Sequence, residues 1–309
     1  MPPDPSLASR DRINRAIEHV LQHLDEPLRL ETLARVAGLS PFYFHRLFRH
    51  AVGEPVNEFV KRARLERALA LLTRQGWATR RQASLTDIAF ACGFASSSDF
   101  SRCFKQSFGV APRRFDVEAF RTQRREEWER AIADPRQRHA LKRLPRGANP
   151  DGFRVRLRRL PARRVAYIRV PNAYASSSAV GDAVARLLRW AEARSLADGQ
   201  WLGYQWDDPE IVPHEKGRYD VGLEVPPSVV PGGGIGRIDF PAMQVAEVEI
   251  RGGINLEMRA LDWLLGTWLP ASGYVPAERQ PCFETWIGRP FAHGTEHFEL
   301  LAQSPVERA

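Results

Sequence analysis

One sequence pattern occurs twice in the first half of the chain, in residues 30–59 and again in residues 84–115. Four pairs of glycine or phenylalanine show the repeat. Gly38 and Gly93 are 55 residues apart, and the other three pairs are each 56 residues apart: Phe48 and Phe104, Gly53 and Gly109, and Phe59 and Phe115. Because the glycines recur together with the apolar positions, both copies must adopt the same local structure. The repeat therefore predicts a duplicated unit.

Each copy predicts two short helices joined by a tight turn. In the second copy, Ser84-x-x-Asp87 fits the capping box that begins a helix, and the same spacing recurs twelve residues later. Gly93 lies between the two starts and tolerates the positive φ of a sharp helix end. In the first copy, Ser40-Pro41 supplies an N-cap followed by proline at the first helical position. These signals predict two helix-turn-helix units.

The second helix of each unit has an apolar face and a polar face. The inward positions are Phe44, Leu47 and Phe48 in the first unit, and Phe100, Cys103, Phe104 and Phe108 in the second. The outward positions are Phe42, His45 and Arg46 in the first unit, and Ser97, Ser98, Ser101, Arg102 and Lys105 in the second. A face that is rich in donors and free of core residues suits the major groove of DNA.

The segment between the two units predicts a stiff linking helix. Residues 57–73 keep leucine and alanine at helical spacing without glycine or proline, and residues 10–24 predict an amphipathic support helix. Two recognition helices that enter successive major grooves lie about 34 Å apart, so a rigid spacer would let one chain bind an asymmetric site.

Residues 9–120 resemble the DNA-binding domain of AraC/XylS-type regulators. The matching motifs are LETLARVAGLSPFYFHRLF from Leu30, RLERALALL from Arg64 and IAFACGFASSSDFSRCFK from Ile88. The resemblance implies an all-α domain that binds double-stranded promoter DNA, with RNA polymerase as a further partner. It also implies that bases or phosphates are contacted by Phe42, His45, Arg46, Ser97, Ser98, Ser101 and Arg102. For Phe42, a packing role is an equal alternative.

The composition predicts a soluble, two-domain protein. Hydrophobic residues make up 43% and charged residues 27% of the chain, and no apolar run approaches the roughly 20 residues of a membrane span. The start has no signal-peptide pattern, and the three cysteines form no CxxC pair. We therefore expect a cytoplasmic protein with no cofactor, no bound metal and no membrane partner, and the oligomeric state stays open.

Charge is distributed unevenly along the chain. Residues 1–150 hold 27 Lys and Arg against 17 Asp and Glu, whereas residues 151–309 hold 18 against 20. The first half therefore suits a polyanion such as DNA. We expect residues 1–8 to form a flexible tail, and residues 121–151 to form a helix followed by a basic, solvated linker.

The second half also contains a duplication, with an offset of 80 residues. The paired positions are Pro161 and Pro241, Val165 and Val245, Tyr204 and Glu284, and Trp206 and Trp286. Each half follows the order strand, strand, helix, strand, strand, with helices near residues 177–194 and 256–268. Residues 152–309 therefore predict a pseudo-twofold α+β sheet, with helices on one face and a groove on the other.

This second region resembles the GyrI-like effector-binding domain, which also occurs in multidrug-sensing regulators. The matching motifs are RYDV from Arg218, WLP from Trp268 and PCFE from Pro281. The resemblance implies a small-molecule pocket that contains Glu284 and suits a cationic, aromatic ligand. It also places Tyr174, which precedes the first helix of the domain, at the pocket rim.

Alternation along the strands gives a chemical reason for such a ligand. Glu284 and Trp286 share one face of a strand, and the offset assigns Tyr204 and Trp206 to the corresponding face. A carboxylate among aromatic rings attracts a delocalised cation through charge and cation–π contact. Core packing is an equal alternative for Trp206 and Trp286.

Three functions fit these observations. The first is a transcriptional regulator, expected to be an activator, whose second domain senses a small cationic aromatic molecule. The second is a GyrI-like hydrolase fused to a DNA-binding domain, using Glu284 and Tyr204 as acid and positioning group. The third is an architectural DNA binder with a vestigial sensor domain.

Overall fold

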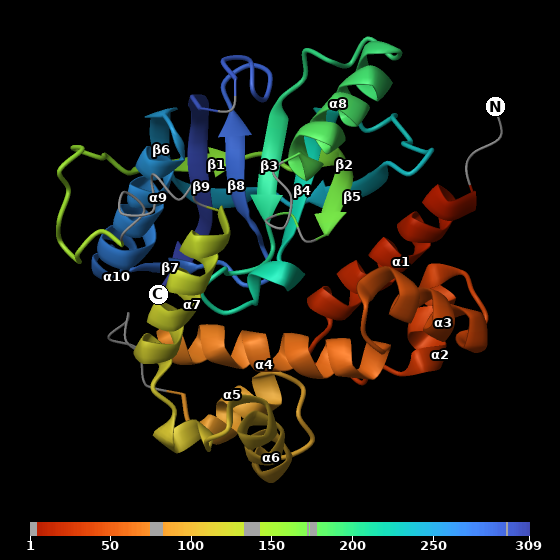
Figure 1. The fold of residues 1–309 in the computed structure, drawn as a ribbon, viewed down its shortest axis with the longest axis vertical. Helices are drawn as coiled ribbons and strands as arrows, with labels where there is room; N and C mark the ends of the chain where they lie inside the picture. The colour runs from red at the N-terminus through yellow and green to blue at the C-terminus, as the bar shows by residue number, and fades with distance from the viewer. Residues whose placement is uncertain (1–4, 75–82, 133–142, 172, 174–177, 295) are drawn as a thin grey trace. The chain divides into compact units, whose positions relative to one another are not determined.

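A computed structural model describes residues 5–309 apart from residues 75–82, 133–142, 172, 174–177 and 295. The chain divides into two compact units, Met1–Phe120 and Arg121–Ala309 (Figure 1). Unit 1 is helical and unit 2 combines a sheet with helices, so the predicted multidomain class is confirmed. None of the described helices is both long and apolar enough to cross a membrane.

Unit 1 contains the two predicted helix-turn-helix units. Its elements are α1 (Pro5–Gln22), α2 (Leu30–Ala37), α3 (Pro41–Val52), α4 (Val56–Arg74), α5 (Leu85–Ala91), α6 (Ser97–Phe108) and the 3₁₀ turn η1 (Pro112–Arg114). The pairs α2/α3 and α5/α6 flank α4, whose 19 residues extend about 28 Å at 1.5 Å per residue. Because α1 begins at Pro5, residues 5–8 are helical rather than part of a tail.

Side-chain caps explain where these helices begin. The Ser84 hydroxyl accepts from Asp87 N at 3.1 Å and Asp87 Oδ2 accepts from Ser84 N at 2.9 Å, so the first capping box is complete. At the start of α6, Ser96 Oγ accepts from Asp99 N at 3.1 Å. The Asp99 carboxylate accepts from Arg102 instead, so only half of the second box forms.

The sequence repeat is also a repeat of packing. Phe44 and Phe48 on α3 are fully buried with ring centroids 5.5 Å apart, and Phe100 and Phe104 on α6 are fully buried with the same separation. Aromatic pairs at this distance stabilise a core beyond their buried area. Each copy therefore anchors its second helix through the same pair of rings.

Gly93 shows why the turn of the second unit requires glycine. Its φ is 80°, and an added Cβ would lie 2.0 Å from the carbonyl oxygen of Leu24. The side chain of Arg64 fills the adjacent space, with Nε donating to Leu24 O at 2.9 Å and Nη2 donating to Glu26 O at 2.8 Å. The linking helix is thereby fastened to the segment after α1 beside this turn.

Unit 2 is built on one antiparallel sheet. Its strands are β1 (Arg156–Leu160), β2 (Arg163–Pro171), β3 (Trp201–Gln205), β4 (Arg218–Val225), β5 (Gly236–Phe240), β6 (Met243–Gly252), β7 (Tyr274–Pro276), β8 (Cys282–Trp286) and β9 (Phe298–Arg308). The order across the sheet is β1-β6-β9-β8-β3-β4-β2-β5, and β7 pairs with β9. Both halves follow the predicted order of strands and helix, and β7 is an additional short strand.

Helices cover one face of this sheet. They are α8 (Ala179–Glu192), α9 (Ile254–Trp263), the π-helical η4 (Leu264–Trp268) and α10 (Leu269–Ala271), and a 3₁₀ turn η3 (His214–Lys216) precedes β4. The α8 helix packs on β2 and β4, whereas α9 packs on β6 and β9 (Figure 1). The central strands β3 and β8 separate these two pairs of strands.

The opposite face of the sheet is filled by its own side chains. Tyr167, Tyr204, Phe240 and Phe283 belong to one buried cluster on that face. Their rings meet edge to face or tilted, with centroids 5.0 to 6.3 Å apart. The predicted groove opposite the helices is therefore wrong for the described residues.

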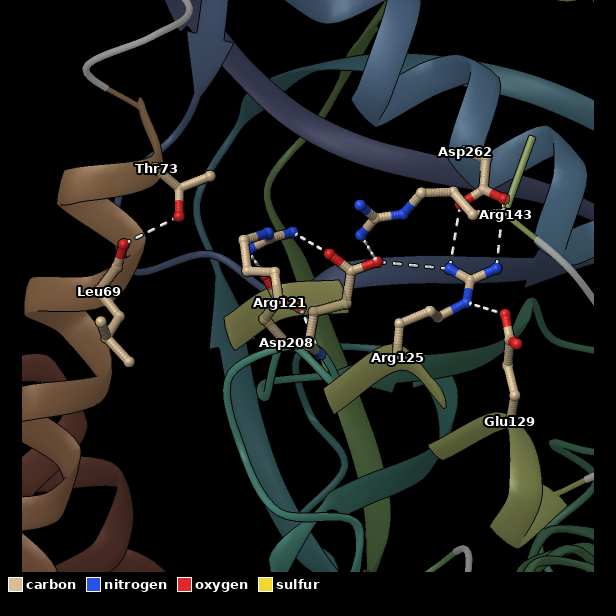
Figure 2. Close-up of polar contacts among 9 residues, drawn as sticks. Leu69, Thr73, Arg121, Arg125, Glu129, Arg143, Asp208 and Asp262 are labelled. Carbon is tan, nitrogen blue, oxygen red and sulfur yellow. Dashed lines mark hydrogen bonds and ion pairs between the residues drawn. The ribbon is translucent and has the colours of Figure 1, made fainter. Parts of the chain in front are cut away.

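The boundary between the units falls within α7 (Val117–Ile132). Arg125 Nη1 and Nη2 donate to the two carboxylate oxygens of Asp262 at 3.0 and 3.2 Å, and Arg121 Nη1 donates to Asp208 at 2.8 Å (Figure 2). Beyond the helix, Arg143 pairs with Glu210. Three arginines of residues 121–151 thus pair with acids of unit 2, although many other described residues of this segment are exposed. Residues 133–142 lie outside the described residues.

Candidate functional site

The first predicted DNA-contacting group lies on α3. Phe42 is 74% exposed, Arg46 is exposed, and His45 is half-buried. The Arg46 guanidinium carbon lies 5.8 Å from the centroid of the Phe42 ring, so the two side chains form one cation–π pair at the surface. An exposed ring of this size makes no contribution to the core of unit 1, which leaves it available to a partner.

The second predicted group lies on α6. Ser98 and Arg102 are exposed, whereas Ser97 and Ser101 are half-buried. Arg102 Nη2 pairs with Asp99 Oδ1 at 2.6 Å, one turn earlier on the same helix. This exposed pair holds the guanidinium along the helix and contributes little to stability.

The 56-residue offset places matching positions on the two helices. It relates Phe42 to Ser98 and Arg46 to Arg102, so α3 and α6 each carry one arginine at the matching position. The same offset relates Arg49 to Lys105, and both are exposed. Arg49 was not among the predicted DNA contacts. Its basic counterpart Lys105 at the matching position of the second unit is the sequence signal that could have identified it.

A second candidate site lies on the helix-covered face of unit 2. Glu284 on β8 is directly opposite Gly203 on β3, and the Tyr219 hydroxyl of β4 donates to Glu284 Oε2. An added Cβ at Gly203 would lie 1.8 Å from the Tyr219 oxygen and 2.8 Å from Glu284 Oε2. The absence of a side chain on β3 therefore makes room for this hydrogen bond.

Tyr219 also lines a small pocket beneath α8. Its other walls are Val180 and Val184 of α8, Leu202 and Val221 of the sheet, Trp286 at the end of β8, and Pro290 and Phe291 beyond that strand. Trp286 and Glu284 share one face of β8, as strand alternation predicted, and Trp286 borders the pocket on the helix-covered face. Tyr219 therefore borders the apolar pocket and also donates a hydrogen bond to the Glu284 carboxyl group.

Tyr204 and Trp206 do not join this pocket, so the prediction that they share a face with Glu284 is wrong. Tyr204 pairs with Phe283 across β3 and β8, and neighbouring strand residues point to opposite faces. Tyr204 is fully buried, and Trp206 packs against the same cluster and donates to Asp220 at 2.9 Å. Glu284 and Tyr204 therefore cannot act together as a hydrolytic pair. Tyr174 lies outside the described residues.

The position of Glu284 changes its acidity. Burial raises the pKa of its carboxyl to about 7, although the hydrogen bond from Tyr219 acts in the opposite direction. Glu257 on α9, which the sequence analysis did not select, has a pKa raised well above its ordinary value by burial and by the charge of Glu284. The site therefore contains two carboxyl groups with weakened acidity.

Comparisons with known families match both halves of the chain. Residues 33–116 match a helix-turn-helix domain, and residues 153–301 match the GyrI-like small molecule binding domain. The second match contains Glu284, Tyr219 and Glu257.

Individual relatives match the first unit. SoxS, a regulatory protein of Salmonella typhimurium, is 32% identical over 106 residues, which are 34% of this chain and 94% of SoxS. PocR, a regulatory protein of the same species, is 34% identical over 104 residues, which are 34% of this chain and 32% of PocR. The chain thus matches almost all of SoxS but only about a third of PocR.

Among solved structures, the DNA-binding domain of the global transcriptional factor AdpA, in complex with a target DNA, has 29% identity. The likeness covers 37% of this chain and 96% of that domain, with a TM-score of 0.32. The EcmrR C-terminal domain has 15% identity and a TM-score of 0.39, covering 51% of this chain and 99% of that domain. On the family matches and the relation to SoxS, the chain belongs to the AraC family of transcriptional regulators and continues into a GyrI-like small molecule binding domain.

Proposed function

We propose that this chain is a ligand-responsive activator that binds promoter DNA through α3 and α6 and senses a cationic aromatic molecule in unit 2. RNA polymerase is the second macromolecular partner in this proposal. Relatives that are 33% identical over 102 residues are named transcriptional activators, which supports the positive sign of regulation. The matched segment is 34% of those relatives, so the sign is proposed from the DNA-binding part alone.

The observation that carries the proposed ligand class is the environment of Glu284. Its carboxyl group accepts a hydrogen bond from Tyr219, which lines the same pocket as Trp286, and no described Lys, Arg or His pairs with it. A buried acid without a basic partner is stabilised when a cation replaces its proton. Aromatic walls add cation–π attraction for a delocalised positive charge.

Fluorescence anisotropy of the full chain on labelled fragments of its own upstream DNA tests this function. We expect affinity for one fragment to fall steeply as salt rises, because phosphate contacts release counterions. The cationic probe 1-methyl-4-phenylpyridinium should change that affinity, and Glu284→Gln should abolish the response while leaving the affinity without probe unchanged.

Arg46→Ala combined with Arg102→Ala is the matched control, since it should remove DNA binding and leave the thermal shift produced by the probe. Absence of salt-dependent DNA binding at every probe concentration would contradict the proposed regulator. A probe response that survives in Glu284→Gln would contradict the proposed sensing site.

A further inference from the structure

A second acid lies close to Glu284 but comes from a different element. Glu257 is in the first turn of α9, and it is 5% exposed together with the buried Met258 and Ala260. The α9 helix packs on β6 and β9, and Ala302 of β9 pairs directly with Glu284 of β8. The α9 helix thus packs on the strand next to Glu284, and Glu257 lies close enough for the charge of Glu284 to raise its pKa.

The buried Glu257 and the half-buried Glu284 differ from the other buried acids of unit 2. Asp220 pairs with Arg169 at 2.7 Å, Glu210 pairs with Arg125 and Arg143, and Glu247 accepts from Gln303 at 2.8 Å. Within the described residues, no Lys, Arg or His pairs with Glu257 or with Glu284, and Tyr219 is the donor found on Glu284. Unit 2 contains many arginines, yet none of the described ones forms an ion pair with Glu257 or Glu284.

A pair of buried acids without a counterion has two ways to avoid an uncompensated charge. Both groups can keep their protons, and the raised pKa values of Glu257 and Glu284 fit that state in the free protein. Alternatively, a ligand can supply the missing positive charge. A singly charged ligand balances one carboxylate and leaves the other group protonated, whereas a doubly charged ligand balances both.

We propose that Glu257 is a second cation-binding residue beside Glu284, and that the Glu257–Glu284 pair selects aromatic ligands with two positive charges over singly charged ones. This inference rests on the proposed ligand-binding role of unit 2 and specifies its ligand class. Glu284 contacts either kind of ligand, and Glu257 discriminates between them.

Two probes of nearly the same shape distinguish the effect of ligand charge on binding from the effect of the aromatic rings. Methyl viologen has two joined aromatic rings and two fixed positive charges, and 1-methyl-4-phenylpyridinium has the same arrangement with one charge. Isothermal titration of the full chain without DNA should give about tenfold tighter binding of methyl viologen, the size of one additional charge-assisted contact.

Glu257→Gln should remove this preference by weakening methyl viologen about tenfold while leaving the singly charged probe unchanged. Glutamine has the size of the protonated acid, so the variant should fold. Glu284→Gln should weaken both probes. Glu247→Gln is the control, because Glu247 is equally buried but lies on the opposite face of the sheet, and it should leave the preference intact.

Equal binding of the two probes by the wild-type protein would overturn the inference, and so would a Glu257→Gln variant that weakens both probes to the same extent. Either result would leave the proposed function standing, because a singly charged ligand would still bind. Failure of both probes to bind the wild-type protein would contradict the proposed function itself.

Discussion

At the residue scale, the carboxyl group of Glu284 makes the stability of unit 2 depend on pH. Its pKa rises from the ordinary 4.5 to about 7 in the folded protein. Below pH 4.5 the group is protonated in both states and has no effect. Between pH 4.5 and 7 the unfolded chain loses this proton first, so stability falls as pH rises, by up to about 3 kcal/mol, and it stays lower above pH 7.

Glu284→Gln should remove this fall, leaving the variant more stable than the wild type at pH 8 and similar at pH 4.5. Urea unfolding followed by tryptophan fluorescence measures the difference, since seven of the eight tryptophans lie beyond residue 120. Parallel pH profiles for the two proteins would show that the Glu284 carboxyl is not perturbed.

The sequence located Glu284 and Trp286 but misplaced Tyr204 and Trp206, and the reason is one residue of register. An offset of 80 relates Tyr204 to Glu284, whereas the sheet pairs Gly203 with Glu284. Since side chains alternate between faces, a shift of one residue moves the whole set to the other side. Strand patterns define a face well within one strand, but they do not define the register between strands.

Glu257 was missed for a different reason, although a signal was present. The first turn of α9 reads Ile254-Asn255-Leu256-Glu257, and an acid near a helix start is usually a solvated partner of the helix dipole. Its burial depends on how α9 packs over β9, which is a contact with a distant part of the chain. The sequence signal is that Glu257 lies close to the apolar residues Met258 and Ala260 of the same helix, which argues against a solvent-exposed side chain.

At the element scale, α7 depends on a buried cluster of opposite charges. The Asp262 carboxylate accepts two hydrogen bonds from Arg125 and a third from Leu144 N at 2.9 Å. Arg125 and Asp262 are both nearly buried, with 7% and 8% of their side chains exposed. Without the Asp262 carboxylate, Arg125 keeps Glu129 at 2.5 Å and Glu210 at 3.5 Å, but two of its buried N–H groups and Leu144 N lose their charged acceptor. We expect this loss to cost about 3 kcal/mol in total.

Asp262→Asn should therefore destabilise unit 2 by about 3 kcal/mol in urea unfolding followed by tryptophan fluorescence. Glu127→Gln on the same helix is the control. Glu127 pairs with Arg124 at 2.7 Å, with more than a quarter of each side chain exposed, so its loss should change stability by less than about 1 kcal/mol. A loss of the same small size for Asp262→Asn would contradict a stabilising role for the cluster.

The short helices of unit 1 could be predicted from local sequence patterns, whereas the charge cluster around Arg125 and Asp262 could not. Helix starts are encoded locally, as the Ser84 and Asp87 cap shows. By contrast, Arg125 and Asp262 are 137 positions apart, and nothing near Arg125 indicates a distant acid. An arginine-rich stretch therefore has the same local pattern whether it is solvated or paired inside a domain.

At the scale of the whole molecule, the boundary between the two units after Phe120 determines how much net charge each unit carries. Residues 1–120 hold 18 Lys and Arg against 13 Asp and Glu, a balance of +5, and residues 121–309 hold 27 against 24, a balance of +3. Half of the excess of +10 in residues 1–150 thus belongs to residues 121–150, which group with unit 2. Several of these pair with acids there, as Arg121, Arg125 and Arg143 do.

This division predicts which arginines contribute to the salt dependence of DNA binding. Arg102 is 78% exposed on a recognition helix, so Arg102→Gln should reduce the slope of log affinity against log salt by about 1. Arg143 is 37% exposed and already neutralises Glu210, so Arg143→Gln should leave the slope unchanged. Anisotropy titrations of both variants from low to moderate salt measure the two slopes. Equal reductions would mean that the basic stretch after residue 120 also contacts phosphates, and that its pairing with unit 2 gives way when DNA binds.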